Sequence, residues 1–466
     1  MTITGSSAAE ALRVTIHGPQ GRVDLAVPSV TTVGALIVAV AGRLLPVDAH
    51  EGSWVLQRLD EAPFDPDGTP ETLDWRDGER FHLRPASDPL PELDFDDIAD
   101  GMATAVRRRP DRWNRTVNRL TFLGLAAVAF GTTAVVLGRA TTPSWRAVGA
   151  LVLTGGMMAT AALVGYRRGD RALAAVLGLA GCGYAGLFGL FTAHRSGPIL
   201  LGAGPDVLMA GAAGVLLAAV TLLALQRLVA PRLPIEPLGI AGGIGLGVVV
   251  AMGLYLGTGM TAAQDAGVVG IACLNLLIAA PLVATRAARL RGPQLPRTAE
   301  DLQIDVEPYH AEEVVTRVDI AEAYLTVLAG VAAVLVAGAC WYLLRTPNWM
   351  TCVFAALLAS SLLLRAREFR SIPQRLFLVA GGVVGGEMVI DSVTGPLSSL
   401  WRVLTLTGLI FAGYLLVLAA LRPETRRLLP IWGYLANVLE TLGTLALMPL
   451  MMYLLGVFAW ARGLAG

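Results

Sequence analysis

The stretch RRRPDRWNRTVNRLTFLGLAAVAFGTTAVVL, residues 107–137, decides how the rest of the chain can fold. Its first part carries six arginines and a single acidic residue, Asp111, and its second part, 120–137, has no charge. A run of about 20 apolar residues at roughly 1.5 Å per residue crosses the hydrocarbon core of a bilayer. Because arginine-rich flanks remain in the cytoplasm, this segment is predicted to anchor the chain, with everything before it in the cytoplasm.

Apolar runs of this kind recur through the remainder of the chain. They cover 120–137, 145–166, 172–192, 207–225, 235–256, 266–285, 321–344, 347–364, 376–393, 398–421 and 431–461. After the first run, the segments predicted to face the cytoplasm hold seventeen arginines, and those on the opposite side hold six. This bias keeps its phase through all eleven runs, which predicts an all-α membrane domain over 120–461 with a cytoplasmic N-terminus and a C-terminus on the opposite side of the membrane. The last run is too long for one crossing, so 430–434 is expected to lie in the interface.

Composition agrees with a polytopic membrane protein and excludes one class of enzyme. Of the 466 residues 15% are charged, against about a quarter in soluble domains. The net charge of zero hides an acidic N-terminal part, because residues 1–100 hold 7 arginines and 18 acidic residues. All 36 basic residues are arginine, so the phosphate-binding lysine of a P-loop ATPase is missing. The four cysteines lie in apolar runs and are interpreted as packing residues.

Residues 10–86 read as a small cytosolic domain that follows a disordered N-terminus, 1–9. Alternating apolar residues predict strands at 13–17, 22–27, 54–59 and 79–84. Helical spacing predicts a helix over 33–45 that stops at Pro46. The order strand, strand, helix, strand, strand predicts a β-grasp, ubiquitin-like fold whose expected role is docking.

The cytosolic connections carry opposite charges. The linker 87–119 is first acidic, with Asp96 and Asp97, and then basic around Trp113. The cytosolic loop 286–320 is acidic and includes Glu312 and Glu313. These five residues are candidate partner-docking residues, although a solvated helix explains the acidic segment of the linker equally well.

Four ionisable residues fall inside the predicted spans or at their ends: Glu387, Asp391, Arg402 and Glu440. Such residues are functional candidates because a charge within the membrane is costly. Glu387 and Asp391 are four residues apart on one helix face, so either could pair with Arg402. The alternative is a proton or ion pathway. No protease or hydrolase motif accompanies them, and no catalytic residue, metal site or cofactor is predicted; bound membrane lipids are expected.

Glycines repeat every four residues in two of the spans. They are Gly239, Gly243 and Gly247 in one span, and Gly382 and Gly386 in another. Small residues at this spacing let helices approach closely. They indicate either packing within the bundle or a dimer face.

The whole order resembles the EccD membrane subunit of the mycobacterial type VII (ESX) secretion systems. The resemblance rests on the strand DGERFHLRP at 77–85, the acidic segment FDDIAD at 95–100, the basic entry with Trp113, and eleven spans with an acidic loop after the sixth. It covers essentially the full chain, and ESX-3 is the system we favour.

The resemblance implies a non-enzymatic scaffold subunit of the bacterial inner membrane, so the C-terminus is expected in the periplasm. Such proteins dimerise around a lipid-filled membrane vestibule and assemble with EccB, EccE and the ATPase EccC, which the ubiquitin-like domain would contact. The alternative function is a proton-coupled secondary transporter with a soluble regulatory domain. The two differ in that a scaffold co-purifies with an ATPase, whereas a transporter acts in isolation.

Overall fold

The computed structural model describes residues 11–44, 54–59, 61–86, 115–139, 142–167, 169–194, 204–290, 311–395, 397–421 and 430–464. The chain divides into two compact units, Met1–Asn114 and Arg115–Gly466. The residues predicted to form a disordered N-terminus, 1–9, and the linker up to residue 114 lie outside the described residues.

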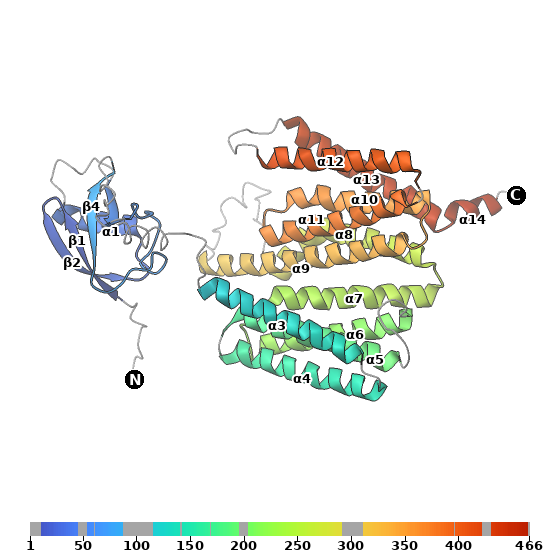
Figure 1. Ribbon diagram of the computed structural model, residues 1–466, viewed down its shortest axis with the longest axis horizontal. Helices are drawn as coiled ribbons and strands as arrows, with labels where there is room; N and C mark the ends of the chain where they lie inside the picture. The colour runs from blue at the N-terminus through green and yellow to red at the C-terminus, as the bar shows by residue number, and fades with distance from the viewer. Residues whose placement is uncertain are drawn as a thin grey trace, which may run out of the picture. The chain divides into compact units, whose positions relative to one another are not determined.

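The described residues of the first unit form a four-stranded sheet with one helix (Figure 1). Its elements are β1 (Ala11–Gly18), β2 (Gly21–Pro28), α1 (Val33–Leu44), β3 (Trp54–Arg58) and β4 (Glu79–Pro85). The strand order is β2-β1-β4-β3, with β1 antiparallel to β2 and parallel to β4. A parallel pair requires a crossover connection, and the chain from α1 to β3 provides it. The predicted β-grasp fold is therefore confirmed.

Alternation along the strands places the core on one face of the sheet. Ile16, Leu56 and Phe81 are fully buried there, and Val33 and Val40 of α1 belong to the same cluster. The helix period and the strand period thus bury one common set of apolar residues, which is what holds a domain of this size together.

The opposite face of the sheet brings two histidines together. His17 and His82 are register partners on β1 and β4, and their rings stack with centroids 5.4 Å apart. Burial lowers the pKa of His82, and the nearby His17 and Arg84 lower it further. Sequence spacing did not indicate this contact because it depends on the parallel register of two strands far apart in the chain.

The second unit is a helical bundle (Figure 1). Its helices are α3 (Arg115–Gly138), α4 (Pro143–Arg167), α5 (Arg171–Ala193), α6 (Pro205–Leu228), α7 (Ile235–Thr258), α8 (Ala262–Ala287), α9 (Ala311–Leu343), α10 (Trp349–Arg365), η3 (Ala366–Glu368), α11 (Ile372–Thr394), α12 (Ser399–Ala420), α13 (Pro430–Leu454) and α14 (Val457–Leu464). Among the described residues, α3 to α13 are the eleven helices long and apolar enough to cross a membrane.

The last predicted run, 431–461, divides into two helices. α13 runs without a break from Pro430 to Leu454, and the chain then turns at Gly456, whose φ is 76°. Glycine adopts a positive φ more readily than other residues. Helix α14 begins directly after this turn. Part of the surplus length of the last predicted run therefore lies in α14, and the interfacial position of 430–434 stays a prediction.

Buried side chains form two clusters within the bundle. One joins α4, α5, α6 and α7 around Leu222 and Leu238. The other joins α8, α9, α10, α11 and α13 around Phe354, Leu358 and Leu362. Helix α7 packs against α9 and connects the two halves.

The glycine repeat of α7 forms this connection. A Cβ atom at Gly239, Gly243 or Gly247 would lie 2.7, 2.4 or 2.3 Å from the nearest methyl carbon of α9, which belongs to Val327, Val331 and Leu335 respectively. Such distances are far below van der Waals contact, so the hydrogen side chain of glycine sets the separation of the two helices. Of the two alternatives for this repeat, the structure has packing within the bundle.

The two repeated glycines of α11, Gly382 and Gly386, do not both contact a neighbouring helix. A Cβ at Gly382 would lie 2.7 Å from Leu363 of α10, whereas a Cβ at Gly386 would meet no atom within 4 Å. Gly381 and Gly385 are the other glycines of this helix that contact neighbouring helices, through Ala333 and Ala359. The two glycines predicted to act together therefore have different surroundings.

Two spanning helices lie almost outside the packed core. No residue of α12 is buried, and none of the apolar window of α3 is buried. Figure 1 shows α12 together with the start of α13 at the upper margin of the row of helices, and α4 at the lower margin. An apolar helix that packs so little against its own bundle must be covered by lipid or by another protein.

Candidate functional site: a charged cluster between α10 and α13

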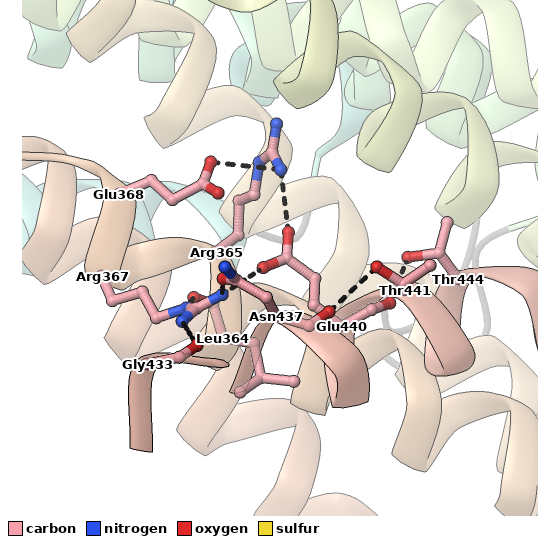
Figure 2. A network of polar contacts seen from close by, with 9 residues as sticks. All are labelled: Leu364, Arg365, Arg367, Glu368, Gly433, Asn437, Glu440, Thr441 and Thr444. Atoms are coloured by element: carbon pink, nitrogen blue, oxygen red, sulfur yellow. Dashed lines mark hydrogen bonds and ion pairs between the residues drawn. The ribbon is translucent and has the colours of Figure 1, made fainter. Parts of the chain in front are cut away.

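Charged side chains from two distant parts of the chain meet at one end of the bundle (Figure 2). Arg365 ends α10, and Arg367 and Glu368 belong to η3 immediately after it. Glu440 comes from α13, 75 residues further along than Arg365. The short 3-10 turn places two arginines of adjacent elements towards the same carboxylate.

Each oxygen of Glu440 binds its own arginine. Arg365 Nη1 lies 2.8 Å from Glu440 Oε1, and Arg367 Nη2 lies 3.1 Å from Glu440 Oε2. Arg365 also pairs with Glu368 at 3.1 Å. Arg367 donates further hydrogen bonds to the Asn437 side chain and to the Gly433 carbonyl oxygen, the latter at 3.2 Å. Four of these side chains thus join α10 and η3 to α13.

Burial makes the loss of one partner costlier in this cluster than in a surface ion pair. The side chain of Glu440 is 14% exposed, and those of Arg365 and Arg367 are 19% and 27% exposed. Breaking a buried pair from one side costs about 3–5 kcal/mol, because it leaves an uncompensated charge. A cavity of 530 Å³ lies beside the cluster and is lined by Glu440 and Asn437 among others. These ion pairs act as a clamp that holds α10 and η3 against α13. The positive charges of its two arginines are balanced by the negative charges of its two glutamates.

The other predicted intramembrane pair takes a different form. Arg402 Nη2 donates to the carbonyl oxygen of Gly395 at 2.7 Å, and Arg402 Nε donates to that of Thr394 at 3.3 Å. Among the described residues no ion pair joins it to Glu387 or Asp391, so the predicted pairing is wrong. The reason is local: the C-terminal carbonyls of α11 lack helical partners and attract a cation just across the turn. Glu387 and Asp391 are exposed on the surface of α11.

The candidate docking residues are only partly described. Asp96, Asp97 and Trp113 lie outside the described residues, as does the side chain of Glu312. Glu313 forms an ion pair with Arg317, one turn along α9. Of the five candidate docking residues, only the side chain of Glu313 is therefore among the described residues.

Sequence reasoning missed the partners of Glu440. Arg365 and Arg367 come directly after the apolar run 347–364, so the sequence pattern places them in a cytoplasmic connection and gives no sign that they meet Glu440. The sequence signal for such partners was a carboxylate within an apolar helix. A charge in that position is costly, so a neighbouring cation is expected. Asp265 was also missed, although it is 4% exposed in the first turn of α8.

The fold and the cluster define a multi-pass membrane protein with an appended ubiquitin-like domain. The family model "EccD-like transmembrane domain" matches residues 118–464. A second model, "WXG100 protein secretion system (Wss), protein YukD", matches residues 11–83. The chain belongs to the EccD-like family, the membrane subunits of type VII secretion, and the resemblance drawn from the sequence is confirmed. It is accordingly a multi-pass protein of the inner membrane.

Two solved structures contain chains with the same fold. One is described as protomer 1 of the ESX-3 core complex; the identity is 20%, the match covers 97% of this chain and 100% of that one, and the TM-score is 0.53. The other is described as a MycP5-free ESX-5 inner membrane complex; the identity is again 20%, the coverages are 89% and 100%, and the TM-score is 0.55. Equal identities do not favour ESX-3 over ESX-5. No curated protein matches the sequence.

Proposed function

We propose that this chain is a non-enzymatic scaffold subunit of a type VII secretion complex. Two copies form a dimer that encloses lipid in the membrane, and the ubiquitin-like domain docks the ATPase subunit. The partners are a second EccD-like chain and components of the EccB, EccC and EccE kinds. Membership of the EccD-like family supports this role.

The observation that carries the proposal is the exposure of α12. Ile410 and Leu416 are 66% and 72% exposed, and no residue of the helix is buried. A helix that packs so little in its own bundle contributes little to folding, so its apolar surface is available to a second subunit and to enclosed lipid. Helix α3 offers a similar surface elsewhere on the bundle.

Cysteine crosslinking tests the dimer. Leu416→Cys on α12 is expected to give a covalent dimer in native membranes under mild oxidation. Val152→Cys on α4 is the matched control, because Val152 is equally apolar and 66% exposed. Crosslinking from α4 without crosslinking from α12 would place the dimer face elsewhere and contradict this assignment.

The proposed orientation has a cytoplasmic N-terminus and a periplasmic C-terminus. It is supported by the excess of arginine in alternate connections. A reporter fused after Gly466 is expected to show periplasmic activity. Cytoplasmic activity at that position would reverse the assignment of both termini.

The acidic cytosolic residues are proposed to hold a basic partner. Reversal of Asp96, Asp97, Glu312 and Glu313 to Arg together is expected to release that partner while the spans remain inserted. Surface pairs contribute about 0–1 kcal/mol each, so single reversals are expected to have little effect. An intact complex at high salt with all four reversed would remove these residues from the docking surface.

The alternative, a proton-coupled transporter, gains no support from Glu440. Both of its carboxylate oxygens are held by arginines from α10 and η3, an arrangement that joins helices. Glu387→Gln separates the two functions. A scaffold keeps secreting with this variant, whereas a transporter assembles but loses its function.

A further inference from the structure

A second polar site lies at the opposite end of the bundle from the Glu440 cluster. It is a cavity of 170 Å³ between the starts of α6 and α8 and the ends of α7 and α9. Its lining residues are Pro205, Leu208, Met252, Tyr255, Ala262, Asp265, Tyr342 and Arg345. A single ordered water needs only roughly 10–15 Å³, so the space admits a larger group.

Asp265 is the unusual residue in this cavity. It is 4% exposed, and among the described residues its buried Oδ1 atom has no hydrogen-bond partner. The first turn of α8 is fixed by a capping box between Thr261 and Gln264, so backbone donors of that turn are directed elsewhere. A buried carboxylate oxygen without a donor is costly, which indicates that a donor group from outside the chain binds here.

The opposite wall of the cavity carries a cation. Arg345 follows the end of α9, is exposed, and forms no ion pair in the described part of the chain. It shares the cavity with Asp265 but does not neutralise it. Tyr255 and Tyr342 line the space between apolar side chains and add hydroxyl groups. The cavity therefore offers one negatively charged hydrogen-bond acceptor, Asp265, and one positively charged hydrogen-bond donor, Arg345.

The cavity lies at the level of lipid headgroups. The four helices around it begin or end beside it, which places it at the limit of the spanning segments. Trp341 and Trp349, near the same end of α9 and the start of α10, are 51% and 70% exposed. Exposed tryptophans at the ends of spanning helices mark the membrane interface.

We propose that this cavity binds the phosphoethanolamine headgroup of a phospholipid. The ammonium group donates to Asp265, and the phosphate accepts from the guanidinium of Arg345. Guanidinium binds phosphate through two parallel hydrogen bonds, and an ammonium has three donors for the carboxylate. A zwitterionic headgroup therefore pairs with Asp265 and Arg345 at the same time. The acyl chains of the lipid extend along the apolar helices below.

Other headgroups match only part of this chemistry. A glycerol headgroup has hydroxyl donors but no ammonium, so it leaves the charge of Asp265 without a counter-ion. A choline headgroup has a positive charge but no N–H donor, so Oδ1 of Asp265 would remain without a hydrogen bond. An inorganic cation would satisfy Asp265 and leave Arg345 without an anion.

Native mass spectrometry of the purified full chain tests the proposal. The chain is reconstituted with equal amounts of phosphatidylethanolamine, phosphatidylglycerol and phosphatidylcholine, and retained lipid is measured for wild type, Asp265→Asn and Arg345→Gln. Asp391→Asn is the control, because Asp391 is an exposed carboxylate at the same end of the bundle. Soluble phosphoethanolamine is added in a separate arm to distinguish lipid from free headgroup.

Wild type and the control are expected to retain phosphatidylethanolamine selectively. Each cavity variant is expected to lose about tenfold in retention, the effect of one charged hydrogen bond. Arg345→Gln changes an exposed residue, so it remains informative if Asp265→Asn does not fold. Equal retention of the three lipids, unchanged retention in both variants, or binding of the soluble headgroup as tightly as the lipid would each overturn the proposal.

Discussion

Replacing Glu440 with glutamine is the most informative single change in the membrane unit. Glutamine keeps the shape of the side chain and removes its charge. Arg365 and Arg367 then lose the carboxylate oxygens that lie 2.8 and 3.1 Å away. Because both guanidiniums are largely buried, water replaces the lost partner poorly.

The size of the effect follows from the cost of stranding a buried charge. Removing one partner of a buried pair costs about 3–5 kcal/mol. The arginines are 19% and 27% exposed, so we expect the lower end of that range, about 3 kcal/mol. At roughly 2–4 °C per kcal/mol for domains of 150–250 residues, the larger membrane unit should lose roughly 6 °C in Tm.

The assay is thermal unfolding of the full chain in nanodiscs, with Glu368→Gln as the matched control. Glu368 pairs with Arg365 at 3.1 Å, but its side chain is 47% exposed, so its loss should cost about 0–1 kcal/mol. A triple variant with Arg365→Met, Arg367→Met and Glu440→Leu should recover stability relative to Glu440→Gln. Equal Tm values for Glu440→Gln and wild type would refute the clamp.

Three further outcomes are expected. Gly247→Ala should destabilise the contact between α7 and α9 by about 1–3 kcal/mol in the same unfolding assay, whereas Gly253→Ala, with open space around it, should not; equal effects would contradict the packing. A double-mutant cycle of Asp391→Asn and Arg402→Gln should be additive within about 0.5 kcal/mol, since the two do not pair, and a larger coupling would restore the ion pair. Burial lowers the pKa of His82, so the isolated domain 11–86 should lose stability as the pH falls below about 6.5, and His82→Gln should lose less; denaturant unfolding at several pH values measures this.

The sequence predicts the strands and helices well where the local spacing of apolar residues determines them. Strands from 11 to 85 follow from alternation, and all eleven spanning helices follow from apolar length. The boundaries move by a few residues because capping decides them, as when α13 continues to Leu454 and the turn at Gly456 starts α14.

The sequence does not determine which charges meet. Glu440 and Arg365 lie 75 residues apart, and no periodicity relates the ends of two helices that become neighbours only after packing. Arg402 shows the opposite error: a pair inferred from helix faces loses to nearby backbone carbonyls. The glycine repeat of α7 suits contact within one chain or between two, so only the three-dimensional structure separates these alternatives.

Affinity purification of the tagged full chain from native membranes, followed by quantitative mass spectrometry, tests the central claim most directly. A secretion scaffold is expected to recover a second, differently tagged copy of itself together with a membrane-anchored ATPase and further secretion components. Deletion of residues 10–86 should reduce the ATPase selectively while the membrane unit stays inserted. Recovery of the chain alone, with proton-coupled transport by the isolated protein in liposomes, would contradict the account.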